Sequence, residues 1–471
     1  MKQFIRNYFI KITLIPTVIL LSAGFICGQT PTPTPQIYAP DDVLIELNPL
    51  NANDLPAIAA QYKLLPTPVS QVGNPPTYQM RIDRTQTSQT PIQIVASMQS
   101  DARITVSETN RKMFEVEKRG LGWTIGRTWS IGRTWSIGRS VKGYYSQWFP
   151  DMIRLDKAHE ISKGAGVTVA VLDTGIDLTH PAFAGKLVPG YDFVDNDDNP
   201  SEEGTTWSGS YGHGTHVSGI IAITAPDAKI MPIRVLDSNG EGELWRIQAA
   251  IIWAINQGAD VINMSFAYPQ EVLPQDNEVL KDMFDFCDDG INIRGKTYPE
   301  INTPGNCVAN GNCMLVTGSG NSGLRDKIYP AALKAESVEI MSVAANTRYD
   351  LLASFSTINE MQSSGGREWV RFVAPGENIV SAMPGGRYGV WSGTSMSAPI
   401  VAGITALAMS KFPTLNTEVL FDQVEERGIA WKCQLPSRGY SIDTSRVDAF
   451  CAVTTGPEQF CGTTRGGNCS E

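Results

Sequence analysis

The sequence predicts an α/β fold, in which a mostly parallel sheet carries helices on both faces, preceded by a small α+β unit. Between residues 147 and 454, short runs rich in Val, Ile and Met alternate with longer runs of helical periodicity. The short runs are apolar at consecutive positions, which is typical of parallel strands covered on both faces. The predicted strands are VTVAVLD (167–173), AKIMPIRVL (228–236), DVINMSF (260–266), MLVTGSG (314–320), SVEIMSVAA (337–345) and RFVAPG (371–376). The predicted helices include LWRIQAAIIWAINQG (244–258) and TSMSAPIVAGITALAMSKF (394–412).

Length and charge limit the function classes. A chain of 471 residues with 42% hydrophobic residues can form one large core and a smaller unit, because single cores stop growing near roughly 250 to 300 residues. The net charge of −10 argues against nucleic acid or an anionic membrane as the main partner, because both are bound through basic patches.

The N-terminus has the pattern of an export signal. Basic residues precede an apolar stretch from Ile12 to Ile26, which is interrupted by Pro16 and is short for a membrane span. We therefore expect residues 1–28 to be a signal peptide, residues 29–40 to be a Pro/Thr-rich linker, and the protein to be secreted. The alternative is attachment to the cell surface through this N-terminal segment, at Cys27.

The other seven cysteines indicate an oxidising destination, because no pair has the CxxC spacing of a zinc or redox site. We expect local disulfides Cys433–Cys451 and Cys461–Cys469, the latter in a tail of residues 455–471. One more bridge is expected among Cys287, Cys307 and Cys313. One thiol is left over, and the sequence does not say which.

Two segments precede the large predicted domain. Residues 41–110 read as the α+β unit, with strand patterns on either side of two helical patterns. Residues 111–146 contain the period-six repeat TIGRTWSIGRTWSIGRS and carry eight Lys or Arg against two Glu, 8 − 2 = +6. We expect this stretch to be a protease-sensitive linker that is cut between Asn110 and Gln147 during maturation. The alternative is repeat slippage without a selected role.

Ser395, in WSGTSMSAPIVAG (391–403), raises the question of a nucleophile. Because Ser favours helix starts and Pro is tolerated in a first turn, its simplest role is to cap the helix that follows. A nucleophile also needs a base, an orienting carboxylate and an oxyanion donor. Candidates exist for each: His213 opens a Gly-flanked helical run, Asp173 ends a predicted strand, and Asn321 follows another strand among glycines.

These residues lie in motifs that resemble the subtilisin-like serine proteases, from about Gln147 to Val453. The motifs are DTGID, HGTHVSG, NMSF, GSGNSG and GTSMSAP. Their order Asp, His, Ser and the lack of a GxSxG elbow distinguish the chain from the α/β-hydrolases. The resemblance implies that Asp173 orients His213, that His213 rather than His216 is the base, and that Ser395 attacks. The Ser395 N–H and the Asn321 amide would hold the oxyanion.

The resemblance also implies two edge segments between which a polypeptide substrate lies extended. The implied substrate-binding residues are Gly240, Glu241, Gly242, Ser265, Phe266, Ala267, Ser319 and Gly320. Glu241 would place a negative charge beside the cleft. Ala267 stands where the family usually has Gly at the wall of the main specificity pocket, which argues against a preference for large aromatic side chains.

An acidic loop, YDFVDNDDNPSEE, lies between the Asp173 and His213 motifs. Its residues Asp192, Asp195 and Asp197 match the calcium-binding loop of some heat-stable relatives, and oxygen ligands at short spacing suit Ca²⁺. The alternative is a solvated acidic loop. No cofactor is expected for the chemistry itself.

Taken with the resemblance, the sequence predicts a secreted, monomeric serine endopeptidase that forms an acyl-enzyme and is made as a zymogen. Residues 41–110 resemble the family's inhibitory propeptide and would be the enzyme's own intramolecular inhibitor. Two alternatives remain, a serine esterase and a catalytically silent surface-binding protein. The silent protein should have lost a triad or oxyanion residue, and none is missing.

Overall fold

The computed structural model describes residues 38–73, 76–115, 142–205, 208–269, 292–293, 296–297, 313–323, 327–333, 340–358, 369–435 and 440–454. The predicted signal peptide, the Pro/Thr-rich linker, the period-six repeat and the C-terminal tail lie outside these ranges. No helix within them is long and apolar enough to cross a membrane. Cys451 is disulfide-bonded, and its pairing with Cys433 stays a prediction.

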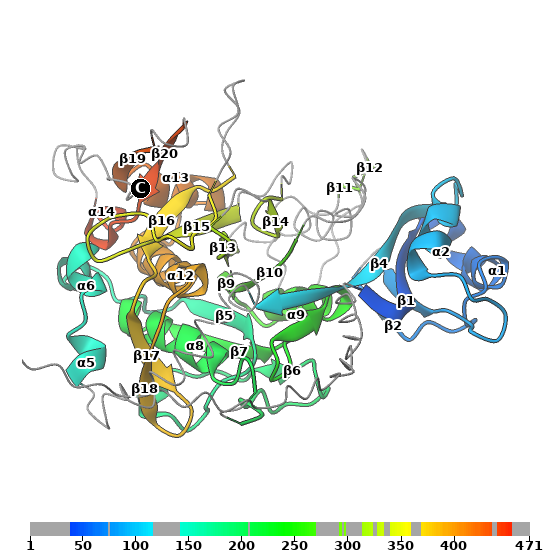
Figure 1. Ribbon diagram of the computed structural model, residues 1–471, viewed down its shortest axis with the longest axis horizontal. Coiled ribbons are helices and arrows are strands. Elements are labelled where there is room, and N and C mark those ends of the chain that lie inside the picture. Colours follow the sequence, from blue (N-terminus) through cyan, green and yellow to red (C-terminus); the bar gives the residue numbers. More distant parts are fainter. Residues whose placement is uncertain are drawn as a thin grey trace, which may run out of the picture. The chain divides into compact units, whose positions relative to one another are not determined.

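The large domain is built on a nine-stranded sheet with the strand order β19-β20-β16-β15-β13-β9-β5-β7-β6 (Figure 1). All neighbours pair in parallel except β19 and β20, which form an antiparallel hairpin at one edge. The strands are β5 (Thr168–Asp173), β6 (Tyr191–Asp192), β7 (Lys229–Arg234), β9 (Val261–Met264), β13 (Met314–Gly318), β15 (Ile340–Asn346), β16 (Phe372–Pro375), β19 (Ile429–Leu435) and β20 (Tyr440–Arg446). This architecture confirms the predicted fold class.

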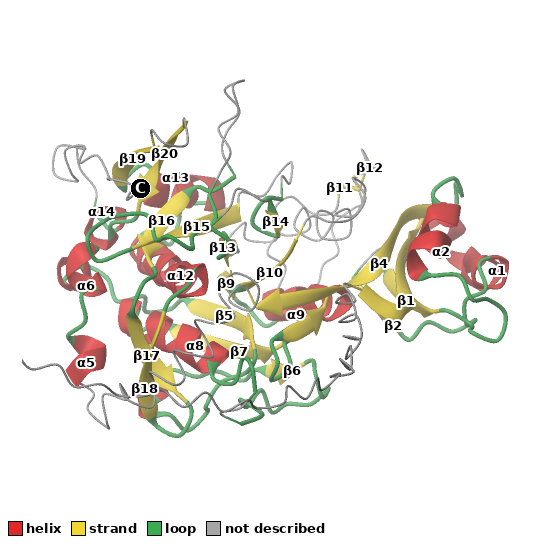
Figure 2. Cartoon of the chain, viewed as in Figure 1, coloured by secondary structure: helices red, strands yellow, loops and turns green. Residues whose placement is uncertain are grey.

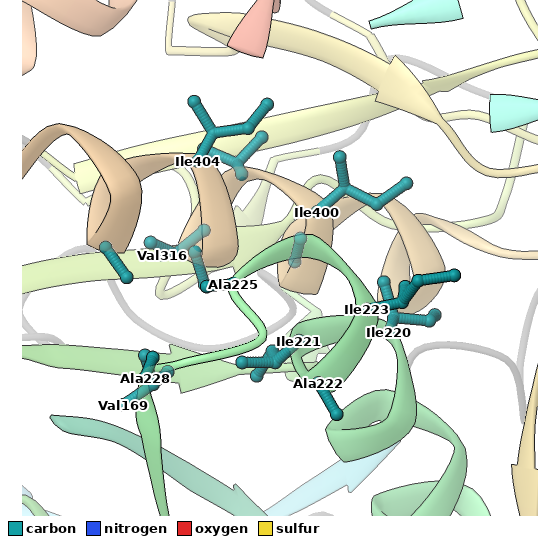
Figure 3. Close-up of a cluster of buried hydrophobic side chains, with 14 of the residues drawn as sticks. Val169, Ile220, Ile221, Ala222, Ile223, Ala225, Ala228, Val316, Ile400 and Ile404 are labelled. Carbon is teal, nitrogen blue, oxygen red and sulfur yellow. The ribbon is translucent and has the colours of Figure 1, made fainter. Parts of the chain in front are cut away.

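Helices bury both faces of this sheet. In β5, Val169 and Val171 belong to one core cluster and Ala170 and Leu172 to another, as expected when successive side chains of a strand point to opposite faces. The first cluster includes α8 (His213–Thr224) and α12 (Thr394–Lys411), and the second includes α9 (Leu244–Asn256). Figure 3 shows side chains of α8 and α12 meeting Val169 and Val316 from the sheet.

Shorter elements complete the large domain. They are α5 (Lys142–Tyr145), α6 (Phe149–Met152), α7 (Leu155–His159), η2 (Pro181–Phe183), β8 (Glu241–Glu243), β10 (Phe266–Pro269), β11 (Asn292–Ile293), β12 (Lys296–Thr297), β14 (Ile328–Tyr329), β17 (Ile379–Met383), β18 (Arg387–Trp391), α13 (Thr417–Glu425) and α14 (Ala449–Ala452). Strands β17 and β18 form an antiparallel hairpin that leads directly into the start of α12. This hairpin is absent from our sequence-based assignment.

Residues 38–115 form an α+β unit with a core of its own. An antiparallel sheet in the order β4-β1-β3-β2 carries two helices, as Figure 2 shows. Apolar residues of strands and helices, including Val43, Ile45, Ile58 and Ile94, meet in a separate cluster. Its elements are β1 (Tyr38–Leu47), η1 (Pro49–Asp54), α1 (Leu55–Gln61), β2 (Ser70–Val72), β3 (Thr77–Arg81), α2 (Pro91–Met98) and β4 (Ile104–Glu115).

Strand β4 runs past the predicted boundary at Asn110. Its first part pairs with β1 inside the small unit. Its last residues, Lys112 to Glu115, pair instead with β8 on one side and β10 on the other, both antiparallel. One strand therefore joins the α+β unit to the two edge segments that the sequence assigns to substrate.

Candidate active site

Asp173 is the last residue of β5, at the carboxyl end of the parallel sheet, and is 1% exposed. Such ends are where functional residues gather in open α/β sheets. Its Oδ1 accepts a hydrogen bond from the Thr174 backbone N–H at 2.8 Å and from Nδ1 of His213 at 2.7 Å. A carboxylate in this position selects the His213 tautomer that carries its proton on Nδ1.

His213 is the first residue of α8 and is fully buried. Gly214 brings this helix start against the end of β5, because a Cβ at Gly214 would lie 2.1 Å from the Gly175 carbonyl oxygen and 3.0 Å from the Asp173 Cβ. The Gly214 N–H also donates to Thr174 Oγ1 at 3.0 Å. The small residue of the HGTH motif therefore sets the distance between the imidazole and the carboxylate.

Trp391, the last residue of β18, stacks on both histidines of α8. Its ring centre lies 5.6 Å from that of His213 and 5.0 Å from that of His216, with interplanar angles of 30° and 13°. Burial lowers the pKa of His216 to about 3, and the neighbouring His213 adds to this effect. His216 is therefore a neutral packing residue near neutral pH.

Ser395 is the second residue of α12, and it does not cap that helix. Gly393 is the N-cap and makes no side-chain capping bond. The Ser395 hydroxyl donates instead to the Ser265 carbonyl oxygen at 3.2 Å. Our expectation that Ser395 caps the helix is therefore wrong, because α12 begins at Thr394, two residues earlier than a cap at Ser395 requires.

Pro399 lies inside α12 rather than in its first turn, which is a second correction. Because proline has no N–H, the carbonyl of Ser395, four residues earlier, has no helical donor at that position. The Ser265 hydroxyl donates to this carbonyl at 3.3 Å. Ser265 and Ser395 are thus joined by two reciprocal bonds, which hold the connection between β9 and β10 against the start of α12.

Asn321 follows β13 and is 4% exposed. Its Oδ1 accepts from the Thr394 N–H at 2.8 Å, and the Gly320 N–H donates to Thr394 Oγ1 at 3.1 Å. These bonds orient the Asn321 amide beside the N-terminus of α12. The hydroxyl of Ser319, two residues before Asn321, donates to the Thr357 carbonyl at 2.8 Å.

Strands β8 and β10 hold the end of β4 between them. Met113 is opposite Gly242 and Phe114 is opposite Glu241 on one side, while Phe114 is opposite Ala267 and Glu115 opposite Phe266 on the other. Gly240 lies immediately before β8, and Ser265 immediately before β10. The structure thus places an extended segment of this chain between the two predicted substrate edges.

Glu202 is a site residue that the sequence analysis missed. Its Oε1 accepts from Thr174 Oγ1 at 2.7 Å and its Oε2 from Thr215 Oγ1 at 2.8 Å. Burial raises the pKa of Glu202 to about 7, and the nearby charge of Asp173 acts in the same direction. Because Thr174 follows Asp173 and Thr215 lies two residues after His213, this carboxyl connects the end of β5 to the start of α8. Only the acidity of the loop marked it in the sequence.

The predicted calcium ligands are only partly brought together. Carboxylate oxygens of Asp192 and Asp195 lie within 4.8 Å of one from Glu203, and Asp197 is not in this group. Arg234, which is opposite Asp173 in the β5–β7 pair, forms ion pairs with all three carboxylates, at 2.7 Å, 2.5 Å and 3.0 Å. The side chain of Asp197 accepts from the Asn199 N–H instead. A guanidinium thus holds the position expected for the cation, and the calcium site stays a prediction.

Comparisons with known proteins agree with this fold and order of motifs. Residues 164–427 match the family described as Subtilase family. The chain is 36% identical over 326 residues to the thermophilic serine proteinase of Bacillus sp. strain AK1, covering 66% of this chain and 68% of that protein. It is 32% identical over 329 residues to thermitase of Thermoactinomyces vulgaris, covering 66% of this chain and 97% of thermitase.

Among solved structures, fervidolysin from Fervidobacterium pennivorans, a keratinolytic enzyme related to subtilisin, shares the fold. The TM-score is 0.62 at 22% identity, covering 90% of this chain and 62% of fervidolysin. The fold and the sequence matches define a subtilisin-like serine protease. This chain belongs to the subtilase family.

Proposed function

We propose that the protein is a secreted serine endopeptidase, made as a zymogen, in which Asp173, His213 and Ser395 cleave peptide bonds. The observation that carries the proposal is the 2.7 Å hydrogen bond between the buried His213 and Asp173, at the helix start that lies against the end of β5. A serine hydroxyl is too weak an acid to attack an amide unaided. His213 therefore takes the Ser395 proton as Oγ bonds to the scissile carbonyl carbon, and Asp173 stabilises the imidazolium.

The tetrahedral intermediate needs donors for its oxyanion. The Ser395 N–H lies in the first turn of α12, where backbone N–H groups are unpaired and the helix dipole favours negative charge. The Asn321 amide, oriented by Thr394, supplies the second donor. His213 then gives its proton to the leaving amine, the C–N bond breaks, and an acyl-enzyme remains on Ser395. Water releases the acyl group by the same steps in reverse.

The groove favours polypeptides over simple esters. An extended segment placed like residues 112–115 forms backbone ladders with both β8 and β10, and a small ester offers no such ladder. This supports an endopeptidase over the esterase alternative. The catalytically silent alternative is not favoured, because each residue of the proposed chemistry is present.

The same pairing supports zymogen control. Residues 112–115 fill the groove, so no second extended chain can pair with both edges at once. The described ladder to β10 ends with Glu115 opposite Phe266, the neighbour of Ser265, whose carbonyl accepts from the Ser395 hydroxyl. We therefore propose that maturation cuts the chain shortly after Glu115, within the predicted linker. Export by residues 1–28 completes the proposal.

The test compares the wild-type protein with Ser395→Ala and Ser397→Ala, each expressed with the whole chain. We expect Ser395→Ala to lose peptide hydrolysis and to accumulate as the uncut precursor. Ser397 lies on the same helix, and its hydroxyl donates to the Ala374 carbonyl at 3.1 Å. Ser397→Ala is therefore the matched control and should remain active.

N-terminal sequencing of the active secreted enzyme tests maturation, and the first residue is expected shortly after Glu115 and before Gln147. Near wild-type turnover by Ser395→Ala would disprove the catalytic assignment. A mature terminus upstream of residue 100, or an active enzyme that keeps residues 41–146 attached, would disprove zymogen control by this strand.

A further inference from the structure

Three successive side chains at the end of β4 meet three different environments. Arg111 and Lys112 are cationic, and Met113 is apolar. All three precede the backbone ladder to β10, on the side away from Ser395. Their contacts with the large domain show which side chains an extended segment can place there.

Lys112 contacts Glu241 of β8. Its Nζ lies 3.4 Å from Oε2 of Glu241, and the two side chains are 30% and 37% exposed. Water and salt screen a pair this exposed, so the contact contributes modestly to binding. The Lys112–Glu241 contact nevertheless favours a cation over a neutral side chain of the same length, because Glu241 carries a full negative charge.

Arg111 lies over the ring of Tyr268 in β10. The guanidinium carbon is 5.1 Å from the ring centroid. Arg111 is 5% exposed and Tyr268 is 3% exposed, and cation–π attraction is strongest in such a desolvated position. Tyr268 is itself stacked on Tyr329 of β14, with ring centroids 5.7 Å apart, so the ring is fixed in the large domain.

Met113 is fully buried, in the cluster that contains Leu236, Leu244 and Phe266. A long unbranched side chain adapts well to such an irregular apolar space. Gly242 of β8 is opposite Met113. A Cβ at Gly242 would lie 2.7 Å from Leu236 Cδ2, so the β8 backbone packs directly against Leu236 of this cluster. The groove thus offers an apolar site immediately after the two cationic ones.

We propose that Tyr268 and Glu241 form a recognition site for polypeptides with two consecutive basic residues, placed immediately before the residue that enters the apolar cluster. The inference rests on the proposed function and gives it a substrate class. The two basic positions lie four and three residues before Glu115, where the described ladder to β10 ends, and the apolar position lies two residues before it. The enzyme then selects substrates that resemble the end of its own β4.

The experiment uses mature wild-type enzyme and internally quenched peptides with the sequence of residues 109–118. One peptide is unchanged, one has Gln in place of Arg111, one has Gln in place of Lys112, and one has both changes. Each peptide is assayed with wild type, Glu241→Gln, Tyr268→Leu and Tyr268→Phe. The readout is the ratio of kcat/KM between charged and neutral peptides within each enzyme, so a general loss of activity in a variant cancels.

We expect wild type to prefer Lys over Gln by about threefold, as for an exposed ion pair, and to lose this preference in 0.5 M salt or in Glu241→Gln. We expect a preference for Arg over Gln of about fivefold, as for a partly exposed cation–π pair, because a free peptide lacks the β1 strand that pairs with Arg111 in the intact chain. Tyr268→Leu should abolish it, while Tyr268→Phe, which keeps an aromatic face, should retain it.

The outcomes separate this inference from the proposed function. Failure of the wild-type enzyme to cleave any of the four peptides refutes the proposed function. Cleavage of all four peptides at equal rates leaves the endopeptidase intact and overturns the recognition site. An Arg preference that survives Tyr268→Leu, or a Lys preference that survives Glu241→Gln, also overturns it.

Discussion

The proposed reaction centre and the proposed substrate groove are built in opposite ways. At the proposed reaction centre, Asp173, His213 and Ser395 are at most 1% exposed, and side-chain hydrogen bonds position them. The groove between β8 and β10 is defined by backbone pairing along several residues, and its charged rim is about one-third exposed.

This difference indicates where a single substitution has a large effect and where it has a small one. In the reaction centre each buried polar group has few partners, and water cannot replace a lost one, so one substitution has a large effect. In the groove, binding is shared among backbone groups that no substitution removes, so side chains adjust selectivity rather than create binding. The three predictions below challenge this contrast, from its strongest expected effect to its weakest.

The largest effect concerns Arg234, which is 4% exposed at its side chain and anchors the acidic loop beside Asp173. We expect Arg234→Met to lower the free energy of unfolding by about 3 kcal/mol, because removing one partner leaves the buried Asp192 uncompensated. Chemical denaturation in the Ser395→Ala background, which avoids self-digestion, measures this. The control is Arg84→Met, whose ion pair with Asp41 is largely exposed and should contribute less than about 1 kcal/mol.

A second experiment in the same Ser395→Ala background tests whether calcium stabilises the protein. Because the Arg234 guanidinium already lies among Asp192, Asp195 and Glu203, we expect a calcium chelator to leave the melting temperature of the Ser395→Ala protein unchanged. A fall of several degrees that Asp195→Asn abolishes would contradict this and would establish the calcium site predicted from the sequence. Equal losses in the free energy of unfolding from Arg234→Met and Arg84→Met would show that the buried and exposed ion pairs contribute equally to stability.

Glu202 gives a pH-dependent effect of intermediate size. Its pKa is raised by burial from an ordinary value of 4.5 to about 7 in the folded protein. Between these values the folded state holds more protons than the unfolded state, so the free energy of unfolding falls as pH rises. Because the side chain keeps some exposure, we expect a contribution of roughly 1 to 2 kcal/mol between pH 5 and 7.5.

Glu202→Gln should flatten this dependence, since the amide does not titrate in that range. Denaturation at pH 5 and 7.5 in the Ser395→Ala background measures it. Asp198→Asn, in the exposed part of the same loop, is the control and should keep the wild-type slope. An unchanged slope in Glu202→Gln would show that this carboxyl is charged throughout and is not part of the buried centre.

The sequence predicts the elements of the large domain well, because their apolar runs depend on local periodicity. It also predicts that Asp173 ends a strand and that His213 begins a Gly-flanked helix. It does not predict the Arg234 ion pairs, because β6 and β7 become neighbours only in the folded sheet. Glu202 was missed for the same reason, since its partners Thr174 and Thr215 lie 28 and 13 residues away.

The smallest effect concerns Ala267, a groove residue that is 8% exposed and opposite Phe114. Ala267→Gly removes one methyl group at the predicted pocket wall while leaving the ladder intact. We expect kcat/KM for peptides with Phe before the scissile bond to rise about threefold relative to peptides with Ala there, since one methylene in such a pocket is worth roughly 1 kcal/mol. The Ala peptide is the internal control, because its side chain does not reach the space that the methyl group occupied. No change in the ratio would show that Ala267 does not line the specificity pocket. A loss of activity on both peptides beyond tenfold would show that the groove, like the reaction centre, depends on single side chains.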